Sequence, residues 1–79
     1  MADKNLPSID KEKTGENIRR LMRLNRMSTW DVQKALDFQS GRNVYSWTQG
    51  KVIPSAENLM RLAYLFNCKV DDILIKEEP

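Results

Sequence analysis

The sequence predicts an all-α fold, a compact bundle of about five short helices. Apolar residues recur at the i, i+3, i+4 and i+7 spacing of amphipathic helices in several segments, and runs of β-branched residues are absent. Only three Gly and three Pro occur in 79 residues, which leaves little room for long loops. We therefore expect one small domain with an economical core.

The first 13 residues are polar, contain Pro7 and show no sustained period, so residues 1–13 are expected to form a flexible N-terminal arm. Thr14 is the predicted N-cap of the first helix, with Glu16 in its first turn. This helix should span about 15–25. Its inward apolar side chains are expected to be Ile18, Leu21 and Met22.

A second helix is predicted over about 29–36. Ser28 and Asp31 have the spacing of a capping box, with Asp in place of the usual Glu or Gln. Met27 and Val32 occupy the positions of a hydrophobic staple. The expected inward side chains are Val32, Ala35 and Leu36.

A tight turn over 37–39 should lead to a third helix, with Ser40 as its cap and Gly50 as its left-handed stop. This helix is predicted over about 41–49. Val44 and Trp47 are expected to face the core. A pair of short helices joined by a tight turn is one physical solution to reading DNA, because one helix braces on the backbone while the other enters the major groove.

Pro54 and Ser55 form a strong start signal for a fourth helix, predicted over about 56–66 with Ser55 as N-cap. Its inward side chains are expected to be Leu59, Leu62, Ala63 and Phe66. A short fifth helix should follow around 70–74. The folded domain is thus expected over 14–75, with a short acidic tail at 76–79.

Composition excludes several classes of function. The chain has one Cys and no His, so a disulfide framework and Cys/His zinc sites are excluded, as are His-based catalytic pairs. We expect no enzyme activity, no cofactor and no metal. The apolar runs are too short for a membrane span or signal peptide, so a cytoplasmic, nucleoid-associated location is expected.

Charge is unevenly distributed although the net charge is only +2. Residues 14–61 carry eight basic and four acidic residues, whereas residues 69–79 carry two basic and four acidic residues. Such a gradient would orient the molecule in the field of a polyanion. A solvated mixed surface is the alternative interpretation.

One combination of residues resembles the Cro/C1-type helix-turn-helix family, also called the XRE family, of bacterial and phage regulators. It is Val44-x-x-Trp47-x-x-Gly50-Lys51-x-x-Pro54-Ser55, followed by Leu59-x-x-Leu62-Ala63. Together with Ile18, Leu21, Ser28, Val32, Leu36 and Ile73-Leu74, the resemblance covers about 14–75. It implies a lambda-repressor-like DNA-binding domain.

The sequence departs from the common family pattern in four places. The interval from Ser28 to Trp47 is one residue longer, Asp37 replaces the usual turn Gly, Thr48 stands where Glu is frequent, and Cys68 where Val is usual. The pattern Phe38-x-x-x-Arg42-x-Val44-Tyr45-x-Trp47 resembles a Gram-positive subgroup with this longer turn. We expect Cys68 to be a small core residue.

The resemblance places the N-terminal half of the third helix against base edges in the major groove. Arg42 can bond bidentately to guanine, Asn43 can do so to adenine, and Gly41 would allow close approach of the backbone. The predicted base contacts are Ser40, Gly41, Arg42, Asn43 and Ser46. The predicted contacts to the DNA backbone are Thr29, Tyr45, Thr48, Gln49, Lys51 and Asn58.

Two aromatic residues have more than one interpretation. Tyr45 either braces a phosphate through its hydroxyl or covers the turn beside Phe38. Trp30, at a position where a polar side chain is usual, either stacks on a DNA sugar, meets a partner or folds over the first helix, and we favour the last. Trp47 is expected in the core because its spacing from Val44 demands burial.

The leading hypothesis is a small transcriptional regulator, expected to be a repressor, that binds a double-stranded operator sequence-specifically. No small-molecule ligand domain is expected. Met60, Tyr64, Leu65 and Ile75 lie off the predicted core faces, as a homodimer patch or as scattered exposed apolar residues. The alternative function is a protein-interaction module, such as an antitoxin or an antirepressor-like partner.

Overall fold

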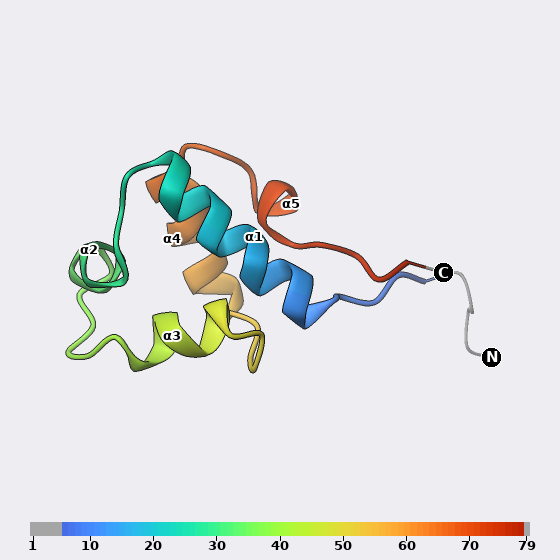
Figure 1. Ribbon diagram of the computed structural model, residues 1–79. Helices are drawn as coiled ribbons and strands as arrows, with labels where there is room; N and C mark the ends of the chain where they lie inside the picture. Colours follow the sequence, from blue (N-terminus) through green and yellow to red (C-terminus); the bar gives the residue numbers. More distant parts are fainter. Residues whose placement is uncertain (1–5, 79) are drawn as a thin grey trace.

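The computed structural model describes residues 6–78 and confirms the all-α prediction. The helices are α1 (Lys11–Leu24), α2 (Thr29–Ala35), α3 (Arg42–Thr48), α4 (Ala56–Phe66) and α5 (Val70–Ile73). Figure 1 shows α1 lying across the bundle between α3 and α5, with α4 behind it. The segments next to residues 6 and 78, at the two ends of the described chain, run side by side away from the bundle.

All five helices contribute to one apolar core. Ile18, Val44, Leu62 and Ile73, from four different helices, are fully buried, and Val32 of α2 joins them. Burial of an aliphatic side chain of this size contributes about 1.5–3 kcal/mol. The rest of the core also matches the predicted inward positions: Leu21, Met22, Leu36, Trp47, Leu59, Ala63 and Phe66. Ala35 was predicted wrongly, because α2 turns it to solvent.

The first helix begins at Lys11, four residues earlier than predicted. Asp10 is its N-cap, and the Asp10 carboxylate accepts a hydrogen bond of 2.9 Å from the Lys13 N–H. The prediction that Thr14 caps this helix was wrong. Thr14 is instead buried within α1, and its Oγ1 accepts a 2.9 Å hydrogen bond from the Ile75 N–H.

The two terminal segments pair with each other. Ile9 and Lys76 form an isolated antiparallel bridge, the Asp10 N–H donates to the Ile75 carbonyl (2.8 Å), and the Glu77 N–H donates to that of Ser8 (2.8 Å). We call segments 6–10 and 74–78 the terminal clasp. Lys11–Lys13, expected in a flexible arm, are therefore helical, and Lys76–Glu77, expected in a tail, are paired. Residues 1–5 of the predicted arm and Pro79 lie outside the described residues.

A glycine in the middle of α1 lets α3 approach closely. A Cβ atom on Gly15 would come within 2.5 Å of the Trp47 carbonyl oxygen and 2.9 Å of the Thr48 carbonyl oxygen. Gly costs about 1 kcal/mol relative to Ala in a helix interior. Gly is present here despite this cost because no space exists for a side chain. The contact of Gly15 with the carbonyls of α3 fixes α3 against α1.

The second and third helices are each shorter than predicted. The capping box of α2 is present, with the Ser28 N–H donating to the Asp31 carboxylate (2.8 Å) and the Asp31 N–H donating to Ser28 Oγ (3.1 Å). Leu36 is the C-cap of α2. The predicted capping role of Ser40 was wrong by one position. Gly41 is the N-cap of α3, and Ser40 Oγ accepts a 3.3 Å hydrogen bond from the Arg42 N–H.

Each of α1 to α4 is followed by a residue with a left-handed backbone. These residues are Arg26 (φ 56°), Asp37 (φ 61°), Gly50 (φ 74°) and Asn67 (φ 54°). After Gly50, the Lys51 N–H donates to the Ser46 carbonyl (3.0 Å), which is the outer bond of a Schellman motif. The corresponding bond joins Met27 to Met22, Phe38 to Gln33 and Cys68 to Ala63. Only one of the four positions is the glycine that this conformation favours.

The last two helices agree with the sequence. Helix α4 begins and ends where it was predicted, and Ser55 Oγ accepts a 3.2 Å hydrogen bond from the Asn58 N–H. Asn17 of α1 holds α5 in place, because its Nδ2 donates to the carbonyls of Asp72 (2.7 Å) and Ile73 (3.0 Å).

Candidate nucleic-acid interface

Helix α3 divides into a buried face and a polar face. Val44, Trp47 and Thr48 are buried against the bundle. The opposite face, at the i, i+3, i+4 and i+7 positions, carries Arg42, Tyr45, Ser46 and Gln49. Asn43 is also exposed, at the edge of this face. The structure therefore gathers the predicted base-contact residues of α3 on one accessible surface.

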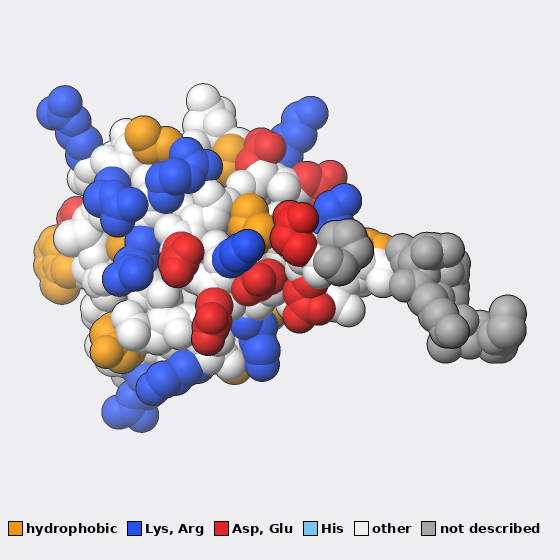
Figure 2. Space-filling model, turned by 45° about the vertical axis from the view of Figure 1, so that its right-hand side comes forward, with side chains coloured by type: hydrophobic (Ala, Val, Ile, Leu, Met, Phe, Trp, Pro, Cys, Tyr) orange, Lys and Arg blue, Asp and Glu red, His pale blue; other side chains and the backbone are white. Residues whose placement is uncertain are grey.

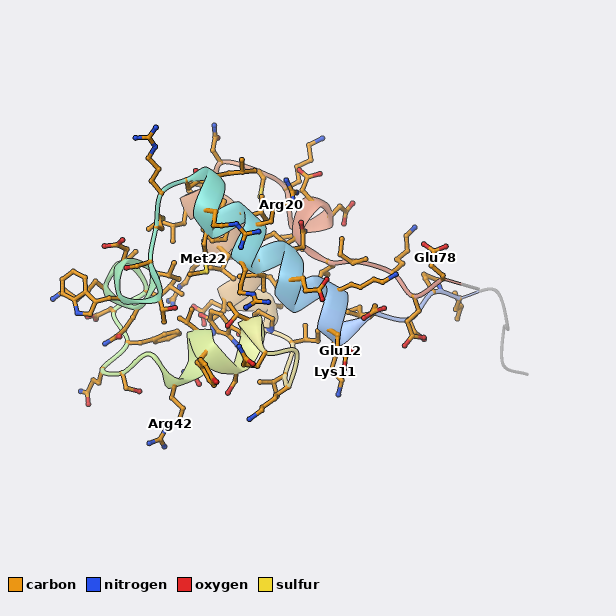
Figure 3. The ribbon with its side chains drawn as sticks, viewed as in Figure 1. Lys11, Glu12, Arg20, Met22, Arg42 and Glu78 are labelled. Carbon is orange, nitrogen blue, oxygen red and sulfur yellow. The ribbon has the colours of Figure 1, made fainter. Side chains whose placement is uncertain are left out.

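Arg42 is free to reach an external partner. It is the first residue of α3, it is exposed, and Figure 3 shows its side chain projecting away from the bundle. Within residues 6–78 the only ion pair joins Arg61 to Glu57 (3.1 Å), so Arg42 is not held by a described carboxylate. Its guanidinium can offer two parallel N–H donors to one acceptor group.

The beginnings of α2 and α3 lie next to each other. A Cβ atom on Gly41 would come within 3.2 Å of Thr29 Cγ2 and 3.3 Å of Gln33 Oε1. The absent side chain of Gly41 thus allows α3 to lie close to α2, a role that the sequence prediction of close approach to DNA did not include. Thr29 is half-buried beside it.

The residues predicted to contact the DNA backbone separate into two groups. Tyr45, Gln49 and Lys51 are exposed, and Asn58 is half-buried at the start of α4. Thr48 is different, because it is only 7% exposed and its hydroxyl donates a 3.0 Å hydrogen bond to the Tyr45 carbonyl. The hydroxyl of Thr48 is thus already satisfied inside α3, and Thr48 does not belong to the accessible surface.

The two tryptophans have opposite environments. Trp47 is 5% exposed, as predicted, and meets Phe38 edge to face with ring centroids 5.9 Å apart. Trp30 is 61% exposed, so the favoured prediction that it folds over the first helix was wrong. Lys34 Nζ instead lies 5.2 Å from the Trp30 ring centroid, within the range of a cation–π contact. Tyr45 is 56% exposed, and the aromatic partner of Phe38 is Trp47.

Charge on the surface follows the gradient seen in the sequence. On the face shown in Figure 2, acidic side chains gather toward the terminal segments, whereas Lys and Arg side chains predominate toward the opposite end. The helix-turn-helix region (residues 28–51) carries Lys34, Arg42 and Lys51 against Asp31 and Asp37, whereas the terminal clasp carries one lysine against three carboxylates. A polyanion would therefore meet a more favourable potential there than at the terminal clasp.

Titratable and metal-binding chemistry is sparse in the described part of the chain. Burial raises the pKa of the Cys68 thiol, and the nearby Asp72 carboxylate adds to this effect. Cys68 is half-buried and packs against the core, in line with a structural role. Among residues 6–78, no three His, Cys, Asp or Glu side chains are grouped to hold a metal ion. In the same range, no helix has the length and apolar character needed to cross a bilayer.

A groove of about 950 Å³, whose lining includes the charged Asp37 and Arg61, lies between the end of α2 and the exposed side of α4. Met60 (54% exposed), Tyr64 (88% exposed) and Leu65 line it, together with Ala35. Ile75 was predicted to share a patch with them. It belongs instead to the terminal clasp, where its N–H and carbonyl are both hydrogen-bonded.

The sequence prediction did not include the packing roles of two glycines that position the polar face. Gly15 holds α3 against α1, and Gly41 holds it against α2. The signal for Gly15 was present, because an isolated Gly inside a helical pattern indicates a close packing contact. Because the sequence predicts Thr14 as the N-cap, it places Gly15 at the start of the helix, where a glycine indicates no packing contact.

Comparison with known proteins agrees with this geometry. Residues 17–78 match the model of a family described as the Cro/C1-type HTH DNA-binding domain. No curated protein sequence matches significantly. Several solved structures share the fold at low sequence identity, among them the three described next.

The first is the restriction-modification controller protein C.AhdI from Aeromonas hydrophila, with 19% identity, 81% of this chain and 96% of that chain covered, and a TM-score of 0.73. The DNA-binding domain of BldD has 18% identity, covers 84% and 94% respectively, and gives a TM-score of 0.70. The clp gene regulator ClgR from C. glutamicum has 17% identity, covers 89% and 88%, and gives a TM-score of 0.72.

These likenesses concern the fold, whereas the family match covers most of the sequence and includes both helices of the turn motif. The chain belongs to the Cro/C1-type helix-turn-helix family of DNA-binding domains.

Proposed function

We propose that this protein is a transcriptional repressor that binds a double-stranded operator sequence-specifically by placing α3 in the major groove. The observation that carries the proposal is the exposed polar face of α3, fixed from behind by three buried side chains and by glycine contacts to α1 and α2. A rigid helix with a polar outer face is what direct readout of base edges requires. Family membership supports DNA binding as the activity.

Base readout is assigned to the N-terminal half of α3. Arg42 would donate two hydrogen bonds to guanine O6 and N7, and Asn43 would pair with adenine N6 and N7. Ser46, one turn after Arg42, would reach the next base pair. Ser40 and Gly41 precede the helix and would lie close to the groove edge.

Contacts to the DNA backbone would fix the register of α3 without reading sequence. Lys51 and Gln49 follow α3 and would meet the phosphates of one strand. Thr29, at the start of α2, and Asn58, at the start of α4, would meet phosphates through their side chains. Tyr45 has the exposure that a hydroxyl contact to a phosphate needs. Thr48 is left out because of its burial.

The mechanism would be occupancy. A domain bound at a promoter excludes polymerase from the same DNA, and its own concentration and partners would regulate it. Such a protein would act in the cytoplasm on the nucleoid. One half-site offers few base pairs, so two copies bound to half-sites about 34 Å apart would gain affinity and specificity.

The groove that contains Met60, Tyr64 and Leu65 is our proposed homodimer contact. Exposed apolar side chains that line one groove are more typical of an interaction surface than of isolated exposed residues. Sedimentation of wild type and Tyr64→Glu should show a dimer that the substitution disrupts. A monomer at all concentrations, with a single half-site selected from DNA, would contradict this contact.

The test of DNA binding is selection of bound sequences from a random duplex pool with wild type, Arg42→Ala and Arg23→Ala. Both substitutions remove one exposed arginine, but Arg23 lies on α1, away from the polar face of α3. We expect Arg42→Ala to relax selection at one base position, at a cost of about 1–3 kcal/mol in specific binding. Arg23→Ala should select the wild-type sequence.

Absence of any enriched sequence for wild type would overturn the proposal. Binding that is steeply salt-dependent but unselective would assign specificity to a protein partner. The antitoxin or antirepressor-like alternative would then be favoured.

A further inference from the structure

The first turn of α1 lies beside the loop that follows α3. A Cβ atom on Gly50 would come within 2.8 Å of Glu12 Cα and 3.2 Å of Glu12 Cγ. Gly50 is followed directly by Lys51, one of the proposed phosphate contacts. The α1 N-terminus is therefore next to the end of the proposed interface, although about 40 residues separate the two in sequence.

Lys11 is an exposed residue that directly precedes Glu12, the residue next to Gly50. It lies one helical turn before Gly15, on the face of α1 that carries Gly15 against the carbonyls of Trp47 and Thr48. Lys11 therefore stands just past the end of α3. Figure 3 shows the Lys11 and Arg42 side chains projecting toward the same side of the molecule.

Lys13 provides an internal contrast. It lies two residues further along α1 and lines a shallow surface depression with Glu16, Arg20 and Ile75, on the side of α1 away from α3. Both lysines are exposed and carry the same charge, so only their positions distinguish them. Neither takes part in the single ion pair found within residues 6–78.

The terminal clasp holds the start of α1 in this position. The Asp10 N–H donates to the Ile75 carbonyl (2.8 Å), and the Asp10 carboxylate caps the Lys13 N–H (2.9 Å). Lys11 follows immediately, so its backbone does not have to be ordered when a partner binds. A preordered backbone lowers the entropic cost of a contact.

We propose that Lys11 is a further contact to the DNA backbone, binding a phosphate that flanks the major-groove site beside Lys51. The inference rests on the proposed function and extends its footprint past the C-terminal end of α3. The contact is electrostatic and reads no sequence. One lysine neutralises at most one phosphate, and Glu12, whose side chain lies against Gly50, adds a nearby negative charge that opposes the contact.

The experiment measures the affinity of wild type, Lys11→Gln and Lys13→Gln for the duplex selected by wild type, at several salt concentrations. Each phosphate contact contributes about 0.9 to the slope of log affinity against log salt. We expect Lys11→Gln to reduce the magnitude of the slope by about 0.9 and Lys13→Gln to leave it unchanged. Lys11→Gln should weaken binding equally on matched and mismatched duplexes, unlike Arg42→Ala.

Two outcomes would overturn the inference while leaving the proposed function intact. One is an unchanged salt slope for Lys11→Gln. If the same variant also unfolds at lower urea concentration, Lys11 stabilises the C-terminal end of α3 and does not contact a phosphate. The other is an equal loss of slope in both lysine variants, which would assign the effect to the general field. If wild type selects no sequence and Arg42→Ala changes nothing, the proposed function fails and this inference fails with it.

Discussion

The helix-turn-helix region (residues 28–51) and the terminal clasp are built by different kinds of interaction. In the former, caps and turns connect residues within five positions of each other, such as Ser28 with Asp31 and Lys51 with Ser46. In the clasp and in its contact with α1, partners are far apart in sequence, as with Ser8 and Glu77 or Thr14 and Ile75. The surface that would meet DNA is thus determined by local contacts. The position of α1, which supports this surface, depends on contacts between the two ends of the chain.

The difference indicates where substitutions should act. A change in the helix-turn-helix region should alter binding with a limited effect on stability, unless it meets the backbone of α1. A change in the clasp should loosen the start of α1 and reach α3 through the close contact at Gly15. Substitutions at both regions test this division.

The largest effect is expected for Gly15→Ala, at the crossing of α1 and α3. The added Cβ would meet three backbone atoms, the closest at 2.5 Å, and backbone cannot move aside as a side chain can. We expect a loss of about 2 kcal/mol or more in the free energy of unfolding, which exceeds the gain of about 1 kcal/mol from helix propensity. Urea denaturation measures it.

Gly41→Ala is the matched control for this substitution. Its Cβ would meet only the side-chain atoms of Thr29 and Gln33, at 3.2 and 3.3 Å, and these can shift. We expect less than half the loss seen for Gly15→Ala. Equal losses in the two variants would show that the α1–α3 contact is no tighter than the α2–α3 contact.

The second largest effect is expected for Thr14→Val, in the support of the clasp. Valine keeps the shape of threonine but removes the oxygen that accepts the Ile75 N–H, so that donor loses its only described partner. An unsatisfied polar group in a part-buried setting costs about 1–3 kcal/mol. Hydrogen exchange should show faster exchange of the Ile75 amide, whereas Thr14→Ser should retain its protection. Slow exchange in Thr14→Val would mean that the clasp does not depend on this bond.

The two regions also differ in how far sequence could predict them. The Ser28 and Asp31 capping box, the left-handed Gly50 and the bounds of α4 followed from residue types at fixed short spacings. The start of α1 did not, because Thr14 and Asp10 are both good caps and the choice depends on Ile75, about 60 residues away. Backbone pairing of the terminal segments requires no particular side chains, so no residue pattern in the sequence predicted the clasp.

The polar face of α3 was predicted more reliably than the individual roles on it. Burial of Val44 and Trp47 determines which side chains face outward, and this pattern is local. Thr48 was misplaced because it was assigned from its place at the end of the third helix, although it lies four residues after Val44 and therefore on the buried face of α3. Trp30 was misplaced because α2 turns this position to solvent, where Lys34 lies over the exposed ring.

A smaller, stabilising effect is expected for Asp37→Gly, in the turn between α2 and α3. Asp37 has a φ of 61°, a conformation that costs an L residue about 1–2 kcal/mol and that Gly adopts without strain. The greater entropy of Gly in the unfolded chain offsets about 0.5–1 kcal/mol of this gain. We expect a net gain of roughly 0.5–1 kcal/mol in unfolding free energy. Asp37→Ala retains the strained backbone and should show no such gain. A gain in both variants would assign the effect to the lost charge.

The smallest effect is expected from acid, through the capping box of α2. Hydrogen bonds from the Ser28 N–H and hydroxyl hold the pKa of the Asp31 carboxyl below its usual value. Because the folded pKa is the lower one, the stabilisation is present above the ordinary Asp pKa of about 4 and is lost as pH falls through the folded value. An NMR titration of the Asp31 carboxyl carbon should show a low midpoint in wild type. Ser28→Ala removes the hydroxyl bond and should raise the midpoint toward the usual value. The remaining N–H donor should keep the shift from vanishing. An identical midpoint in both proteins would mean that the Ser28 N–H alone lowers the pKa of Asp31. The helix-turn-helix region would then depend less on side-chain capping than its sequence suggests.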